Sequence, residues 1–158
     1  MLLKRKIYKE LLSWKNESCG KSALLISGAR RVGKSFICKQ FGENEYRSVI
    51  LVDFSKPSAI IKDIIENDEN DLDVFFSKLS SYCKTVLYKR ESLIVFDEVQ
   101  LFPLARQIIK HLVADGRYDY IETGSLLSIK QNVKNIIIPS EEQEQEMHPL
   151  DFEEFLKL

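Results

Sequence analysis

Short, mainly apolar runs alternate along the chain with longer segments in which apolar residues recur every three or four positions. The short runs predict buried strands, because a brief apolar run is typical of a strand that is covered on both faces. Four such runs are residues 23–27 (ALLIS), 49–54 (VILVDF), 92–98 (SLIVFDE) and 118–123 (YDYIET), and residues 135–139 (NIIIP) are a fifth candidate.

The longer segments predict amphipathic helices, whose apolar stripes would cover such strands. They are residues 3–14, 33–41, 60–65 and 75–88, and a segment that begins at Pro103 and ends at Asp115 and Gly116. Loops are expected at 16–21 and over the acidic residues 67–73. Strands that alternate with helices predict an α/β fold with a central, mainly parallel sheet and helices on both faces.

The composition fits one globular domain and adds few candidates for chemistry. The 158 residues are 44% hydrophobic and 30% charged, and the net charge of −1 gives no general attraction to nucleic acid. No apolar run is long enough to span a membrane and no signal peptide is evident, so a cytoplasmic location is expected. Cys19, Cys38 and Cys83 lack metal-binding spacing and predict reduced, apolar thiols. His111 and His148 are isolated, so no zinc site is expected.

Residues 28–35 read GARRVGKS, which matches the phosphate-loop pattern G-x-x-x-x-G-K-[ST] between a predicted strand and a predicted helix. The two glycines permit backbone angles and close approaches that a side chain would block. The N–H groups of the loop and of the helix amino terminus then form a seat for an anionic polyphosphate. A chance match is the alternative, which this context disfavours. The predicted nucleotide-binding residues are Gly28, Ala29, Arg30, Arg31, Val32, Gly33, Lys34, Ser35 and Phe36.

Two adjacent acids, Asp97 and Glu98, follow the apolar residues of the third predicted strand. Ligands of parallel sheets bind beyond the carboxyl ends of the strands, so both acids are expected at the functional edge. We expect Asp97, with the hydroxyl of Ser35, to hold Mg²⁺. Glu98 points to another side and can orient or deprotonate an attacking water. The alternative for Glu98 is an ordinary surface charge at a strand end.

Further polar residues follow the third and fourth predicted strands. Thr123 and Ser125 stand where a polar group could read the terminal phosphate or the attacking water, and the alternative is a turn stabilised by their hydroxyl groups. Gln100 either forms a relay with Glu98 or simply starts a loop. Arg106 and Arg117 are candidates for an arginine finger that completes another subunit's site, and the plainer interpretation of each is a surface charge.

Guanine specificity is not expected, because no [NT]-K-x-D motif follows the fourth predicted strand. The motifs GARRVGKS, LIVFDEVQ, RYDYIETGS and PSEEQEQEMHPLDFEEFL together resemble a prokaryotic AAA-like ATPase family. The resemblance spans essentially all of residues 1–158. It implies a three-layer P-loop NTPase core of the additional-strand type. In such a core, the strand that ends in Thr123 lies between the strand of Asp97 and the strand before the phosphate loop.

The resemblance also implies roles for individual residues. ATP would bind over Gly28 to Ser35, Mg²⁺ at Ser35 and Asp97, and catalysis would fall to Glu98 with Lys34, with sensing by Ser125 or Thr123. Members usually continue past PLDFEEF into a carboxyl-terminal domain of uncharacterised role. The helix announced by the cap residues 151 and 154 is followed by only a few residues, so we expect that domain to be missing here.

The sequence therefore predicts an Mg²⁺-dependent ATPase core that couples hydrolysis to conformational change. The alternative is a nucleotide-gated binding module with slow or incidental hydrolysis. ATP and ADP are the expected ligands, a carboxyl-terminal domain or a protein is the expected partner, and self-association is left open. We do not expect a membrane partner, nor nucleic acid bound through the basic residues Lys4, Arg5, Lys6, Arg30 and Arg31. The amino-terminal helix, with Lys6 and Tyr8, is a candidate to lie against the base, for which its proximity to the phosphate-loop strand is the only support.

Overall fold

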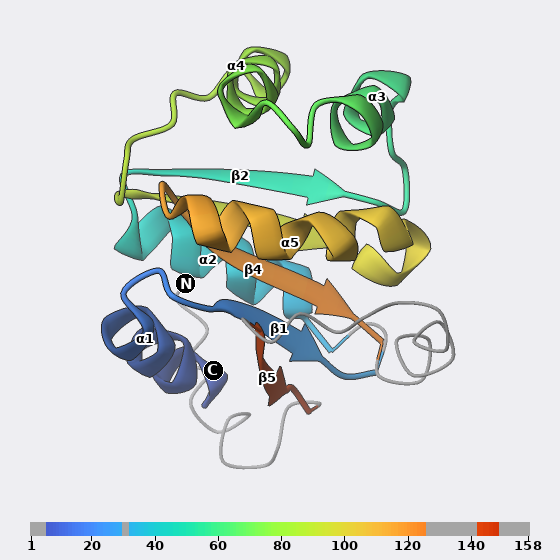
Figure 1. Ribbon diagram of the computed structural model, residues 1–158. Helices are drawn as coiled ribbons and strands as arrows, with labels where there is room; N and C mark the ends of the chain where they lie inside the picture. The colour runs from blue at the N-terminus through green and yellow to red at the C-terminus, as the bar shows by residue number, and fades with distance from the viewer. Residues whose placement is uncertain (1–5, 30–31, 126–141, 149–158) are drawn as a thin grey trace.

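Five parallel strands form one sheet in a computed structural model that describes residues 6–29, 32–125 and 142–148. The order across the sheet is β2-β3-β4-β1-β5 (Figure 1). The strands are β1 (Ala23–Ser27), β2 (Ser48–Asp53), β3 (Ser92–Asp97), β4 (Asp119–Gly124) and β5 (Glu142–Glu146). The predicted order is confirmed, because β4 lies between β3 and β1.

Helices cover both faces of the sheet, so the predicted three-layer α/β architecture is confirmed. They are α1 (Ile7–Ser18), α2 (Lys34–Glu45), α3 (Ala59–Asn67), α4 (Leu72–Cys83), the short 3₁₀ helix η1 (Val99–Leu101) and α5 (Pro103–Asp115). One buried cluster joins α3, α4 and α5 to the sheet, and a second joins α1 and α2 to its other face. Figure 1 shows α5 in front of the sheet and α2 behind it.

Alternation along β3 explains both why this strand is apolar throughout and where its acid points. Ile94 and Phe96 pack with α3, α4 and α5, whereas Leu93 and Val95 pack with α1 and α2. Successive side chains of a strand point to opposite faces, so both sets must be apolar when both faces are covered. Asp97 is in step with Leu93 and Val95 and therefore lies on the α2 side.

Helix boundaries differ from the predictions where local capping decides them. The first helix runs to Ser18, and Cys19 then adopts a left-handed conformation, so part of the predicted loop 16–21 is helical. The fourth helix begins at Leu72, because the Asp71 side chain accepts a hydrogen bond from the N–H of Val74. It ends at Cys83 and not at residue 88, and a left-handed Lys84 follows it.

The fifth strand of the sheet is Glu142–Glu146, a polar segment that the sequence analysis did not identify. The predicted strand at 135–139 lies outside the described residues. β5 forms the end of the sheet and pairs in parallel with β1, from Ala23 opposite Glu142 to Ser27 opposite Glu146. Main-chain hydrogen bonds hold such an edge strand, so it needs no apolar pattern.

The three cysteines are free thiols, but they do not share one environment. Cys38 is fully buried and Cys83 is half-buried, as expected of apolar thiols. Cys19 is exposed, so the prediction is wrong for this residue. It stands directly after α1 in the left-handed conformation that ends the helix, which carries the side chain away from the core.

Candidate functional site

The segment between β1 and α2 has the backbone of a close-fitting loop. Gly33 has φ 93°, in the left-handed region that favours glycine, and it stands directly before α2. A Cβ at Gly28 would lie 2.3 Å from the carbonyl oxygen of Met147. Both glycines are therefore required by the backbone. Arg30 and Arg31 lie outside the described residues, so their predicted phosphate contacts stay predictions.

Lys34 places its ammonium group inside this loop. The side chain is 4% exposed, and its Nζ donates to the carbonyl oxygens of Ala29 at 2.7 Å and Gly28 at 3.2 Å. The first turn of α2 adds N–H groups without helical partners at the same end. A cation and a helix amino terminus together attract an anion.

The two remaining predicted loop residues face different surroundings. Val32 is 8% exposed and packs into the core with α1 and α2, so it anchors the loop. Phe36 is 56% exposed on the first turn of α2, next to Ser35. Its ring therefore faces solvent beside the loop, where a flat ligand could contact it.

Ser35, Asp97 and Thr123 meet where α2 begins and β3 and β4 end. The Ser35 hydroxyl donates to Oδ1 and Oδ2 of Asp97 at 2.7 and 2.8 Å. The Thr123 hydroxyl donates to Oδ1 of the same carboxylate at 2.5 Å. Three residues from three elements, separated by up to 88 positions, thus share one carboxylate. This confirms the predicted placement of Asp97 beside the phosphate loop.

Glu98 turns away from the strand that precedes it. Its φ of 57° and ψ of 46° are left-handed, which is uncommon for a residue other than glycine. Its backbone N–H donates to the Thr123 hydroxyl oxygen at 3.0 Å, and one oxygen of its carboxylate accepts from the Gln100 amide at 2.6 Å. Its side chain is only half-buried, so the carboxylate remains accessible to water.

Ser125 and Thr123 occupy different positions at the end of β4. Thr123 is fully buried, and its hydroxyl links Asp97 to the backbone of Glu98. Ser125 is the first residue after β4 and is 9% exposed at the same edge of the sheet. The geometry therefore brings Thr123 to the two acids and leaves Ser125 beyond them.

Arg106 is not the surface charge that the sequence suggested. It is 3% exposed and lies on α5, where its Nε is 3.9 Å from Oε1 of Glu122, which is 0% exposed. A guanidinium in this buried pair cannot reach another subunit's site without leaving it. Glu122 was not among the predicted site residues, although a charge within a predicted buried strand is a signal of a buried partner.

Arg117 precedes β4 and therefore lies at the amino edge of the sheet, opposite the phosphate loop. Its guanidinium pairs with Asp73 at 2.5 Å and with Asp115 at 3.1 Å, and it lies over the ring of Phe76. These contacts explain its position without a nucleotide.

Tyr8 contacts the end of α2 that lies away from the phosphate loop, and its predicted place against the base stays a prediction. The Tyr8 hydroxyl donates to Oε1 of Glu45 at 2.7 Å, and Glu45 is the last residue of α2. Ser35 is ten residues earlier on the same helix, which is about 15 Å along the axis.

Cys38 is a buried thiol on α2, about one helical turn after Ser35. Burial raises its pKa first, and the charge of Asp97 raises it further, while Lys34 acts in the opposite direction. The thiol therefore stays protonated, and a protonated thiol is a poor nucleophile. The site has no activated cysteine at this position.

The oxygen donors of Ser35 and Asp97 fit Mg²⁺. Both are hard ligands, and their oxygens lie 2.7 and 2.8 Å apart. Among the residues that the structure describes, no group of three or more His, Cys, Asp or Glu could hold a metal. Mg²⁺ is commonly bound by one or two protein oxygens together with substrate phosphates and water. The donor set therefore suits a metal that arrives with a polyphosphate.

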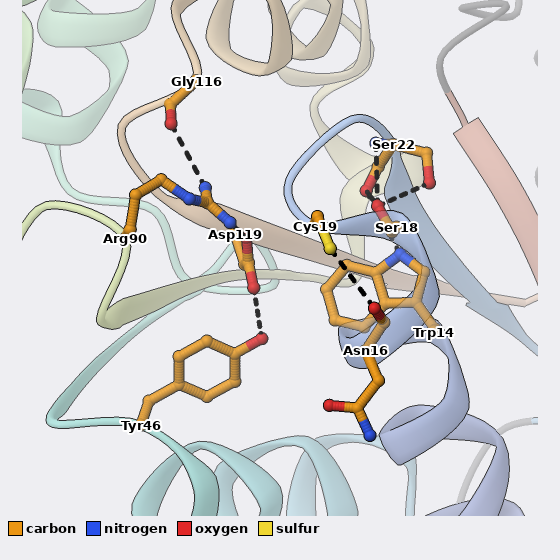
Figure 2. A network of polar contacts seen from close by, with 9 residues as sticks. All are labelled: Trp14, Asn16, Ser18, Cys19, Ser22, Tyr46, Arg90, Gly116 and Asp119. Carbon is orange, nitrogen blue, oxygen red and sulfur yellow. Dashed lines mark hydrogen bonds and ion pairs between the residues drawn. The ribbon is translucent and has the colours of Figure 1, made fainter.

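A second polar cluster lies at the amino edge of the sheet (Figure 2). Asp119, the first residue of β4, accepts from the Tyr46 hydroxyl and from Arg90, both at 2.6 Å, one on each carboxylate oxygen. Arg90 also donates to the carbonyl oxygen of Gly116 at 3.2 Å. These bonds tie the end of α2 to the segments that lead into β3 and β4.

Figure 2 also shows how the end of α1 is tied to the start of β1. The indole N–H of Trp14 and the hydroxyl of Ser18 both donate to the carbonyl oxygen of Ser22, at 3.1 and 3.2 Å. Ser22 in turn donates its backbone N–H and its hydroxyl to the Ser18 oxygen, both at 3.0 Å. The first helix is thereby fixed to the sheet.

Comparisons with known proteins agree with this fold. A family model described as an AAA domain matches residues 20–156. A search of curated proteins gave no match. Among solved structures, a chain of Drosophila ORC bound to DNA has a TM-score of 0.53 at 13% identity and covers 96% of this chain and 94% of its own. This likeness shows the fold alone.

The helicase domain of Pyrococcus furiosus Hef is also similar, with 14% identity over 92% of this chain and 40% of that chain. Its TM-score is 0.40. Of the helices that the structure describes, none has the length and apolar character needed to cross a membrane.

Proposed function

We propose that this chain, which belongs to the AAA-domain family, binds ATP with Mg²⁺ at the carboxyl edge of its sheet and hydrolyses it. The family has a nucleotide-binding, ATPase-type function. One observation carries the proposal: Ser35, Asp97 and Thr123 share hydrogen bonds at the start of α2, next to the phosphate loop.

Binding of the triphosphate would use the loop and the start of α2. The backbone of Gly33 and the N–H groups of the first helical turn face an anion. The Lys34 ammonium would exchange the carbonyl oxygens of Gly28 and Ala29 for phosphate oxygens. The exchange is favourable because a charged acceptor binds an ammonium more strongly than a neutral carbonyl does.

Ser35 and Asp97 would hold Mg²⁺, Ser35 through its hydroxyl and Asp97 through its carboxylate. When bound, the metal supplies positive charge next to the phosphate oxygens. In the structure the Ser35 hydroxyl donates to Asp97. To bind Mg²⁺, it would rotate so that an oxygen lone pair faces the metal. Thr123 would keep the Asp97 carboxylate in place, because its hydroxyl donates to Oδ1 from the neighbouring strand β4.

Glu98 would accept the proton of the attacking water. Its carboxylate is half-buried and lies one residue beyond Asp97, with its backbone fixed to Thr123. A carboxylate that is within reach of water and is oriented by neighbours is suited to act as a general base. Ser125, at the end of β4, is the polar group that we assign to the terminal phosphate.

The test is the variant Glu98→Gln, which keeps the size of the side chain and removes its basicity. We expect ATP turnover to fall roughly 100-fold or more, while ATP affinity changes little, because the base acts only in the transition state. Turnover equal to the wild type would remove Glu98 from the reaction.

The matched control is Lys34→Ala, which weakens phosphate binding itself. Single-turnover phosphate release separates an ATPase from a nucleotide-gated module. Release by the wild type that does not exceed release by Lys34→Ala would favour the module, in which bound ATP fixes a shape and is not hydrolysed.

We also propose that a carboxyl-terminal domain or another protein responds to the conformational change that accompanies ATP hydrolysis. Nucleic acid is not proposed as a partner, and filter binding of DNA and RNA at several salt concentrations tests that view. Salt-sensitive retention would contradict it.

A further inference from the structure

We propose that Gln100 is a positioning residue that holds the carboxylate of Glu98 in the orientation needed to accept a proton from water. The inference rests on the proposed hydrolysis and adds a residue to it. Gln100 does not contact the reacting atoms. It acts through Glu98 alone.

The contact itself is short and lies within a rigid turn. The Gln100 amide nitrogen donates to Oε2 of Glu98 at 2.6 Å, and the glutamine side chain is only 4% exposed. Glutamine is mostly exposed in folded proteins, so burial of this one next to a half-exposed acid needs a reason. Contact with Glu98 supplies that reason.

The backbone around this pair is fixed on both sides. The N–H of Leu101 donates to the carbonyl oxygen of Glu98 at 3.0 Å, and the N–H of Phe102 donates to Val99 at 3.1 Å. Val99 is fully buried, so η1 is anchored in the core between the acid and α5. Gln100 is therefore presented from a turn that is hydrogen-bonded within itself and packed into the core through Val99.

Glu98 is held at both of its ends. Thr123 accepts the backbone N–H, and Gln100 donates to one carboxylate oxygen. The left-handed backbone of Glu98 makes this possible, because it turns the side chain back toward η1. Unusual backbone conformations of this kind recur at functional sites.

An amide suits this position better than a cation would. A carboxylate has several lone pairs, so one donor can fix its rotation and leave other lone pairs for water. A lysine or arginine would add positive charge and weaken the carboxylate as a base. The neutral amide of Gln100 orients Glu98 without adding charge.

The test is the variant Gln100→Leu, which is similar in size and has no donor. We expect kcat to fall roughly 10- to 100-fold, because misplacement of a catalytic group by about 1 Å has effects of this size. The dissociation constant for ATP and the melting temperature should stay close to the wild-type values. Unchanged kcat in a folded Gln100→Leu protein would overturn the proposal.

A second variant keeps the test decisive if leucine prevents folding. Gln100→Glu has the same shape but places a carboxylate against Glu98, and it should lower kcat at least as much. Gln107→Leu is the matched control, because Gln107 is an exposed glutamine on the neighbouring α5, and kcat should stay at the wild-type value. Full turnover by Gln100→Glu would overturn the proposal.

A double-mutant cycle separates this proposal from the proposed function. If Gln100 acts only through Glu98, then Gln100→Leu should have no further effect on the residual turnover of Glu98→Gln. Independent, additive losses would contradict the proposed route. A wild type that does not hydrolyse ATP would overturn both proposals, whereas an inactive Glu98→Gln with an active Gln100→Leu overturns this one only.

Discussion

Two aspartates at opposite edges of the sheet have the same burial and different kinds of partners. Asp97 at the carboxyl edge is 5% exposed, and Asp119 at the amino edge is 6% exposed. Asp97 accepts hydrogen bonds from the hydroxyl groups of Ser35 and Thr123. Asp119 accepts from the Tyr46 hydroxyl and from the Arg90 guanidinium, with one partner on each oxygen.

The difference lies in what the partners can exchange. A guanidinium has only donors and keeps its charge, so Arg90 and Asp119 form a closed pair. A serine or threonine hydroxyl can donate to a carboxylate or turn a lone pair to a cation. The amino edge therefore stabilises the fold, and the carboxyl edge is able to take a ligand. Substitution of Asp97 should therefore weaken ligand binding and change stability little, whereas substitution of Asp119 should lower stability and leave ligand binding unchanged.

The largest expected effect concerns neither aspartate but the buried pair beside the site. Arg106→Met leaves the carboxylate of Glu122 buried without its guanidinium, and we expect the free energy of unfolding to fall by about 3–5 kcal/mol. Chemical denaturation measures this. The double variant Arg106→Met/Glu122→Leu should recover most of the loss, since an apolar pair of similar volume removes both charges. No recovery would show that the two side chains act separately.

At the carboxyl edge, Asp97→Asn should lower the affinity for ATP with Mg²⁺ by roughly 10- to 100-fold, because it removes a charged ligand worth about 1.5–3 kcal/mol. Titration calorimetry measures the affinity. Stability should change little, since the asparagine oxygen can still accept from Ser35 or Thr123. A large loss of stability with unchanged affinity would make this edge structural as well.

The matched substitution at the amino edge is Asp119→Asn. It should lower the free energy of unfolding by about 1–3 kcal/mol, because the Arg90 guanidinium loses its anion. ATP affinity should remain at the wild-type value, since this cluster lies at the opposite edge from Ser35. Weaker ATP binding would mean that the two edges are coupled.

The smallest expected effect concerns pH. Burial raises the pKa of Tyr46, and the charge of Asp119 raises it further. The folded protein therefore keeps this proton to higher pH than the unfolded chain, in which tyrosine titrates near pH 10. The stability that this difference contributes is complete below about pH 10 and is lost as the pH rises further.

Tyr46→Phe removes that proton and should flatten the alkaline fall in stability by up to about 1.4 kcal/mol per pH unit. Denaturation of both proteins between about pH 9 and 11, the range in which tyrosine titrates, measures this difference in slope. The other tyrosines with raised pKa values, Tyr8, Tyr118 and Tyr120, are present in both proteins and cancel. Parallel slopes would contradict the assignment to Tyr46.

Strong patterns in the sequence predicted much of the fold. The first strand has the predicted bounds, and β3 ends at Asp97, because a strand buried on both faces must be apolar until it reaches the edge. β5 escaped prediction because its residues, EQEQE, are all polar. Main-chain pairing with β1 holds this strand, and such pairing does not depend on the types of the paired residues.

The site was predictable where it depends on a motif and not where it depends on geometry. The phosphate-loop pattern predicted the placement of Ser35, and the apolar run predicted that of Asp97. The hydrogen bond between Gln100 and Glu98 depends on the left-handed backbone conformation of Glu98, which the residue types do not predict. Arg106 looked like a surface charge because its partner comes from a strand 16 positions later.

Titration calorimetry of the wild-type chain with ATP, with and without Mg²⁺, tests whether a triphosphate and its metal bind at the phosphate loop. We expect saturable binding that is tighter with Mg²⁺ and is lost or greatly weakened in Lys34→Ala. An absence of saturable heat at high ATP concentration, or equal binding by the wild type and Lys34→Ala, would show that the loop does not bind ATP.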